Sequence, residues 1–188
     1  MKKLLVATVL LLSLTACGKK TSKEDLDPNK TIDTASILDK KDDIDQIKNK
    51  KIVFKAGEDG TQYTQFLTYK GKAYIKLVSE QVGPLNEELQ NAVNQVGVEE
   101  TTRLLRESTD KDADYKQASS LEGFSSQIEI TADKKLKITN SFDLQKIKID
   151  EMSKMPYFKG NNLKEILEME PEKYLEARLS NGAQISDQ

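Results

Sequence analysis

The sequence predicts an α+β domain in which an antiparallel sheet, made of a three-strand meander and a second hairpin, packs against amphipathic helices. Two observations lead to this prediction. Strand-like alternation occurs over residues 51–82 and again over residues 127–139, whereas apolar residues at helical spacing occur between and after these segments. The chain has 188 residues. That length holds one such domain with some to spare, because a domain typically has about 100–200 residues.

The meander occupies the first of these segments. Lys51–Ala56 is rich in β-branched and aromatic side chains and predicts the first strand. Tyr63–Tyr69 and Ala73–Val82 predict the second and third strands, because Lys70-Gly71-Lys72 between them suits a hairpin turn. The mixture of Tyr, Thr and Lys in these strands predicts that one face of the sheet meets solvent.

A long helix is predicted after the meander. Gly83 and Pro84 end the third strand and start the helix, with proline at a favoured first position. Gly97 either ends this helix or interrupts it, since helix-like sequence continues over Glu99–Arg106. The residues of its apolar face recur at helical spacing: Leu85, Leu89, Ala92, Val93 and Val96.

The second hairpin comes from Gln127–Thr131 and Leu136–Thr139, in which polar and apolar residues alternate. Phe142–Ile149 either extends its second strand or forms a separate edge strand.

The C-terminal part is predicted to be helical. Residues 163–167 form a short apolar face, and Pro171 begins another helix that Asn181-Gly182 ends. Ala183–Ile185 predicts a last short strand.

The N-terminus has the pattern of a secretory signal peptide over residues 1–16. Lys2 and Lys3 precede the apolar run Leu4–Leu14, which is shorter than the roughly 20 residues that a membrane-spanning helix needs. Residues 17–50 predict a flexible polar tether, because they hold too few apolar residues to form a core. Residues 51–188 then form the single domain.

Within that tether, a short helix is an open alternative to an extended linker. Thr34 is placed to cap it, and its apolar residues recur at compatible spacing: Ile37, Leu38, Ile44 and Ile47.

Leu14-Thr15-Ala16-Cys17 resembles the lipobox of bacterial lipoproteins, and all four positions match. The resemblance implies a diacylglyceryl group on Cys17 and cleavage between Ala16 and Cys17. Cys17 is the only cysteine of the chain. Two acyl chains anchor a protein stably, since each buried CH₂ contributes about 0.8 kcal/mol. The alternatives are an ordinary secreted protein with a cysteine after its signal, and an uncleaved anchor.

The element order from about residue 50 to 185 resembles the YehR-like lipoprotein family, a domain of unknown function. The matching features are the lipobox, the Tyr69-Lys70-Gly71 turn, the central amphipathic helix, a stretch with Gly123 before a hairpin, and a terminal helix closed by Gly182. The resemblance implies an envelope lipoprotein and assigns no chemistry.

Composition excludes several classes of function. The chain has no His and one Cys, which excludes His-containing metal sites, Ser-His and Cys-His nucleophile pairs, and internal disulfides. The formal net charge of −2 argues against a nucleic-acid binder, which normally carries a basic excess. We expect no cofactor.

Three polar patterns are candidate chemical sites. Asp110, Asp112 and Asp114 open like a Ca²⁺-binding loop, but Tyr115 stands where the loop needs Gly, so a solvated acidic loop is the favoured interpretation. Ser108–Lys111 fits S-x-x-K without the motifs that accompany it in penicillin-recognising enzymes. A further cluster is expected to be a solvated face: Asp39, Asp42, Asp43 and Asp45, with Lys40 and Lys41.

Apolar residues supply the other candidates. Met152, Met155, Tyr157 and Phe158 form a partner or ligand surface if they are exposed, and otherwise belong to a loop that folds over the core. Tyrosines of the meander either line a groove on the sheet or pack across strands: Tyr63, Tyr69 and Tyr74.

These observations predict a lipid-anchored extracytoplasmic protein without catalysis of its own. Its role would be binding, scaffolding or envelope maintenance, with the membrane and an envelope protein as partners. The alternatives are a carrier of a small ligand or peptide with a pocket between sheet and helices, and an Asp/Glu-based hydrolase. The Lys-rich, Cys-poor composition and Gly18 after the acceptor thiol favour a Gram-positive source, with the anchor in the cell membrane.

Overall fold

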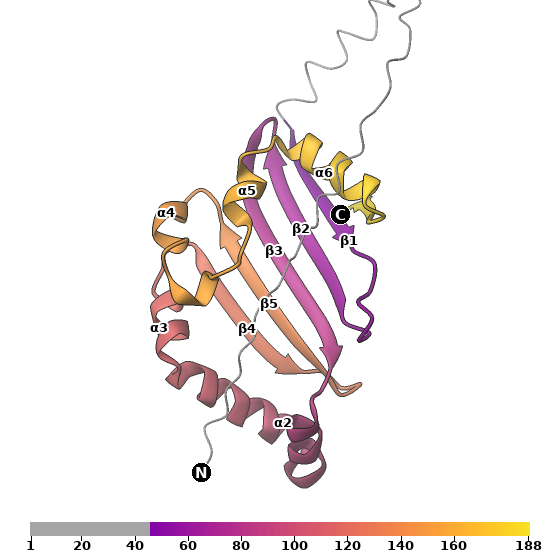
Figure 1. The fold of residues 1–188 in the computed structure, drawn as a ribbon, viewed down its shortest axis with the longest axis vertical. Coiled ribbons are helices and arrows are strands. Elements are labelled where there is room, and N and C mark those ends of the chain that lie inside the picture. Colours follow the sequence, from indigo (N-terminus) through magenta and orange to yellow (C-terminus); the bar gives the residue numbers. More distant parts are fainter. Residues whose placement is uncertain (1–45) are drawn as a thin grey trace, which may run out of the picture.

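Six strands form one antiparallel sheet in the computed structural model, which describes residues 46–188 (Figure 1). They are β1 (Ile47–Val53), β2 (Gln62–Lys70), β3 (Ala73–Pro84), β4 (Phe124–Ile130), β5 (Lys135–Asp143) and β6 (Gln184–Asp187). Their order across the sheet is β4-β5-β3-β2-β1-β6, and all neighbouring pairs are antiparallel. The predicted α+β class is therefore confirmed.

The first strand begins earlier than the sequence predicts. It covers Ile47–Val53 rather than Lys51–Ala56, and Ile47 pairs with Lys70 at the far end of β2. Residues 47–50, assigned above to the tether, thus belong to the sheet, because pairing with β2 and β6 stabilises a sequence with little apolar content of its own. The expected signal peptide and the lipobox lie outside the described residues, as do residues 17–45 of the expected tether. Of the apolar residues of the expected tether helix, Ile47 alone is described, and it lies in β1.

The helices are α2 (Glu87–Lys111), α3 (Ala113–Ser119), α4 (Ile149–Met152), α5 (Leu163–Leu167) and α6 (Pro171–Ser180), with a 3₁₀ turn η1 (Pro156–Phe158). None of them combines the length and the apolar character needed to cross a bilayer. The predicted C-terminal helices and last strand are confirmed, and Phe142 extends β5. Helix α3 was not predicted, because it buries only Ala118.

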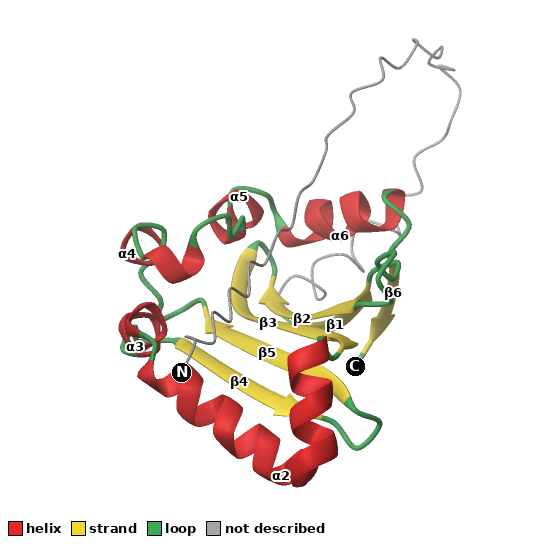
Figure 2. Ribbon diagram, turned by 60° about the horizontal axis from the view of Figure 1, so that its bottom comes forward, coloured by secondary structure: helices red, strands yellow, loops and turns green. Residues whose placement is uncertain are grey.

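Helix α2 is bent at one glycine. It begins after Asn86, whose side chain accepts a hydrogen bond from the Leu89 N–H, so the helix starts later than Pro84, which ends β3. Gly97 has φ 85° and ψ 170° inside the helix, a conformation that is nearly restricted to glycine. Of the two alternatives, Gly97 interrupts the helix, and Figure 2 shows the two segments at an angle.

The buried core lies on one face of the sheet. Paired residues form an apolar row across four strands: Phe124, Phe142, Leu77 and Leu67. Helices α3, α4, α5 and α6 contribute buried side chains to the same cluster. A second cluster joins α2 to Ile128 and Ile138, which lie four residues from Phe124 and Phe142 and therefore share their face.

Side chains of α2 and α3 cover the outer edge of β4. Thr102 Oγ1 accepts a hydrogen bond from the Ile130 N–H at 3.1 Å, and Arg106 Nε donates to the Ile128 carbonyl at 2.9 Å. The Tyr115 hydroxyl donates to the Ser126 carbonyl at 3.3 Å. These contacts occupy backbone groups that would otherwise pair with a strand from another chain.

Candidate functional site

A row of polar side chains crosses the middle of the core-bearing face, between the two apolar clusters. It consists of Ser126, Asn140, Ser79 and Gln65, each paired with the next on β4, β5, β3 and β2. We call these four residues the polar row. Each lies two residues from the apolar row along its own strand, so the two rows share a face. Sheet faces covered by helices are normally apolar, which makes this row unusual.

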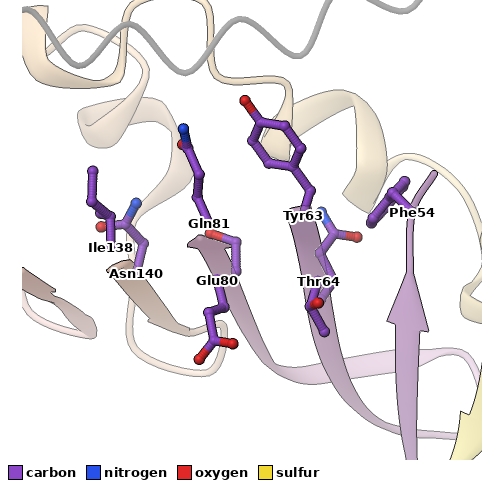
Figure 3. Close-up of a pocket in the computed structure, with 9 residues that line it drawn as sticks. Phe54, Tyr63, Thr64, Glu80, Gln81, Ile138 and Asn140 are labelled. Atoms are coloured by element: carbon purple, nitrogen blue, oxygen red, sulfur yellow. The ribbon is translucent and has the colours of Figure 1, made fainter. Parts of the chain in front are cut away.

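The neighbouring pair Tyr63 and Gln81 widens the polar surface. These residues are paired across β2 and β3 and lie two positions from Gln65 and Ser79. In Figure 3, Tyr63, Gln81 and Asn140 point to the same side of the sheet, whereas Glu80 points to the opposite side. Burial raises the pKa of the Tyr63 phenol, and the nearby Asp59 carboxylate raises it further.

A small cavity lies over this surface. Its walls include Phe54 at one end and Ile138 at the other, with Gln65, Ser79 and Asn140 between them. The volume is about 10 Å³, which is close to the minimum of about 10–15 Å³ for one water molecule. A larger ligand would therefore lie along the surface rather than inside an enclosed chamber.

Asn140 carries the clearest unmet hydrogen-bonding capacity of the site. The residue is 5% exposed, and its Oδ1 is fully buried without a hydrogen-bond partner. A buried acceptor left without a donor costs about 1–3 kcal/mol. A ligand N–H or a bridging water that reached this oxygen would recover that cost.

Gln65, at the β2 end of the polar row, already has a hydrogen-bond partner. It is 5% exposed, and its Oε1 accepts a hydrogen bond from the Tyr174 hydroxyl of α6. Burial raises the pKa of Tyr174, opposed by the Arg178 charge and the bond to Gln65. The Arg178 guanidinium lies over the Tyr174 ring at 4.6 Å and over Phe54 at 5.8 Å from the ring centroids. Arg178 is therefore next to the cavity wall.

Two open hollows lie elsewhere. One, of about 550 Å³, lies between the first segment of α2 and two turns, with Asp59, Gln90, Asp133 and Lys134 among its lining residues. The other, of about 350 Å³, includes Lys76, Ser125, Ser141 and Asp143 in its lining. Within residues 46–188, no three acidic or sulfur-bearing side chains are grouped so that they could hold a metal ion.

The structure places the methionine and aromatic candidates in the core. Met152 and Phe158 are buried, at 1% and 5% exposure, and Met155 and Tyr157 are partly buried against the same cluster. Phe158 packs edge-on against Phe124, with ring centroids 4.8 Å apart. Of the two alternatives stated for these residues, the structure shows the second for Met152 and Phe158, because this segment folds over the apolar row.

The three tyrosines of the meander make different contacts. Tyr69 is buried and its hydroxyl donates to Glu172 Oε1 at 2.7 Å, while the Tyr74 hydroxyl donates to the Ile166 carbonyl at 3.2 Å. Both therefore hold the C-terminal helices on the sheet. Only Tyr63 contributes to the cavity wall.

The acidic candidates that the structure describes cap helices or lie in their terminal turns. Asp112 caps α3 by accepting a hydrogen bond from the Tyr115 N–H at 2.9 Å, Asp110 is in the last turn of α2, and Asp114 is in the first turn of α3. Ser108 and Lys111 lie in the last turns of α2, and Lys111 is exposed. Cys17 and the acidic cluster at residues 39–45 lie outside the described residues.

The residues of the polar row were not identified from sequence. Gln65, Ser79 and Asn140 each stand at a position whose neighbours two residues away are inward-facing. That signal becomes readable only when the pairing of β3 with β5 is known, since alternation within one strand does not say which face is covered.

Comparison with known proteins gives a family model and two solved structures. Residues 47–178 match the model of a family whose description, "-like", names no activity. The NMR structure of the protein from Streptococcus pneumoniae TIGR4 is similar, with 31% identity, a TM-score of 0.70, and coverage of 94% of this chain and 99% of that one. The NMR structure of the E. coli YehR protein also matches, with 18% identity, a TM-score of 0.46, and coverage of 75% and 91%. No curated protein matches the chain.

Proposed function

We propose that this chain, which belongs to the "-like" family whose model matches residues 47–178, is a lipid-anchored envelope protein. In this proposal the protein binds a polar ligand along the polar row. The anchor would be Cys17 at the extracytoplasmic face of the cell membrane. The lipobox pattern Leu14-Thr15-Ala16-Cys17 supports this part of the proposal.

The unpartnered Oδ1 of Asn140 is the observation that carries the binding role. A buried acceptor without a donor is rare in folded proteins, because more than nine-tenths of buried polar groups are paired. Here it belongs to Asn140, one of the side chains that line the cavity. An unpaired buried polar group therefore calls for an explanation, and a bound ligand or an ordered water would provide one.

Binding rather than catalysis fits the chemistry of the row. Its side chains are amides and hydroxyls, Gln65, Ser79, Ser126 and Asn140, which neither ionise near neutral pH nor have a base beside them that would activate a nucleophile. An enclosed carrier pocket would need roughly 300 Å³, far more than the cavity offers. We therefore favour a ligand that lies along the face, held by several hydrogen bonds.

Photo-crosslinking in intact host cells tests this role. The photoreactive residue p-benzoylphenylalanine would replace Gln81, beside the polar row, and in a matched control Glu80, which points to the opposite side (Figure 3). We expect a reproducible adduct from position 81 and none from position 80. The absence of an adduct at 81, or identical adducts from both positions, would reject the polar row as the binding surface.

A further inference from the structure

Helix α2 consists of two segments that are attached to the sheet in different ways. In Figure 2 the second segment, residues 98–111, lies along β4, whereas the first, residues 87–96, turns away from that strand. Gly97 separates them with a backbone conformation far from helical values. Outside the local backbone, no atom lies within 4 Å of the position that a Cβ would take at Gly97. No packed side chain therefore lies against this side of the bend.

The second segment is held by hydrogen bonds to the sheet as well as by apolar packing. Thr102 Oγ1 accepts a hydrogen bond from the Ile130 N–H, and Arg106 Nε donates to the Ile128 carbonyl. Thr102 and Leu105 are buried. Movement of this segment away from β4 would leave the buried Ile130 N–H without an acceptor, which is unfavourable.

The first segment has apolar packing alone. Val93 is buried, and Leu89 is partly buried against the same apolar cluster. Within the described part of the chain, the one hydrogen bond from a side chain of this segment runs from Gln90 Nε2 to the Leu85 carbonyl at 2.7 Å, and Leu85 lies just before the helix. Movement of this segment away from the sheet would therefore break no hydrogen bond between the two.

The hollow of about 550 Å³ lies beside this first segment. Gln90, Val93 and Asn94 line it from the helix, and Asp59 and Lys134 line it from the β1–β2 and β4–β5 turns. Val93 belongs both to the apolar cluster and to the lining of the hollow. The main apolar contact of the segment thus lies at the border of an open space.

We infer that residues 87–96 act as a lid, which opens about Gly97 while residues 98–111 stay on β4. At its other end the lid is joined to β3 by residues 85 and 86, which are not helical. Opening withdraws Leu89 and Val93 from the apolar cluster and extends the hollow toward it. The domain thereby gains an apolar surface that the closed lid hides, and this movement does not depend on the ligand of the polar row.

Amide hydrogen exchange, followed residue by residue with nuclear magnetic resonance on the purified chain, tests the inference. An isolated helix shorter than about 12–15 residues is marginally stable in water, so the backbone hydrogen bonds of the lid break once it leaves the domain. We expect protection factors at least tenfold lower over residues 91–96 than over residues 102–108, with a step at Gly97. Equal protection of the two ranges would overturn the lid, because α2 would then open as one unit. A gradual rise without a step would also overturn it, since it indicates fraying from the helix end.

A matched pair of variants separates a local opening from general instability. Val93 and Leu105 belong to the same apolar cluster, on opposite sides of Gly97. Val93→Ala should lower protection severalfold over residues 91–96 and leave residues 102–108 and β4 unchanged. Leu105→Ala should lower the protection of residues 102–108 together with that of the sheet, because that segment opens only with the whole domain.

An equal loss of protection in both segments and the sheet of Val93→Ala would reject the lid. If either variant fails to fold, the exchange profile of the native chain decides by itself.

Discussion

Thr102 of α2 accepts a hydrogen bond from the backbone N–H of Ile130 on the outer edge of β4, at 3.1 Å. Both groups are buried, so the helix side chain takes the place of a neighbouring strand. With Arg106 and Tyr115, this contact closes one edge of the sheet and fixes α2 beside the polar row.

Removal of this hydroxyl should destabilise the domain. Thr102→Val keeps the shape of the side chain but leaves the Ile130 N–H buried without an acceptor, which should lower the free energy of unfolding by about 1–3 kcal/mol. Urea denaturation followed by circular dichroism measures the change. Thr102→Ser retains the hydroxyl and should recover most of the hydrogen-bond contribution. Equal losses in the two variants would show that the bond is unimportant.

Two glycines should differ in their sensitivity to alanine. Gly97→Ala places a Cβ in open space but imposes a strained positive φ, which should cost about 1–3 kcal/mol. Gly123→Ala has the same backbone strain and in addition brings Cβ within 2.8 Å of the Asp143 carbonyl oxygen and 2.9 Å of the Ile147 nitrogen. We therefore expect a larger loss of stability at Gly123 in thermal or urea unfolding. The reverse order would contradict the described bend in α2.

Replacement of Asn140 by an apolar residue should raise stability and abolish ligand binding. Asn140→Leu removes an unpartnered buried acceptor and replaces it with an apolar side chain of similar size, which should raise the free energy of unfolding by about 1 kcal/mol without ligand. The same substitution should abolish the crosslink from position 81. Urea denaturation and the crosslinking assay measure the two effects. A variant that is less stable than the native protein would show that Oδ1 has a partner.

Alkaline pH should weaken the fold through its tyrosines. Burial raises the pKa of both Tyr74 and Tyr174 above the ordinary value, so the folded state holds the neutral phenol. The resulting stabilisation is complete below about pH 10, the ordinary tyrosine pKa, and is lost as pH rises through the folded-state values. Absorbance at 295 nm and urea midpoints between pH 8 and 12 measure it.

Tyr174→Phe provides the control for that titration. It removes one ionising group, so the decline in stability above pH 10 should become shallower, although the bond to Gln65 is also lost at every pH. A pH dependence identical to that of the native protein would mean that Tyr174 does not contribute to the alkaline loss.

Local sequence patterns predicted the strands and helices of this fold better than they predicted the residues of the site. The β2–β3 hairpin follows from Lys70-Gly71-Lys72, and the second hairpin from alternation in Gln127–Thr131. Ile47–Lys50 escaped prediction because its pairing partners, rather than its own residues, make it a strand. The pairing of Ser79 with Asn140, 61 positions apart in the numbering, creates the polar row, and no local signal fixes that register.

Arg178 illustrates the same limit. In the sequence it is an ordinary cation near the end of an amphipathic helix, and its burial depends on Phe54, distant in the sequence, lying against the guanidinium. Cys17 is the opposite case, because the lipobox is a contiguous pattern that needs no tertiary information.

The account requires that the polar row meets its ligand outside the cell, at the end of a lipid anchor. Intact-mass spectrometry of the protein purified from its native host tests this requirement most directly, with Cys17→Ser as the unlipidated control. The account predicts a chain that begins at Cys17 and carries a diacylglyceryl mass, recovered with the membrane fraction. A chain that retains residues 1–16, or a cleaved chain with a free thiol in the medium, would contradict it.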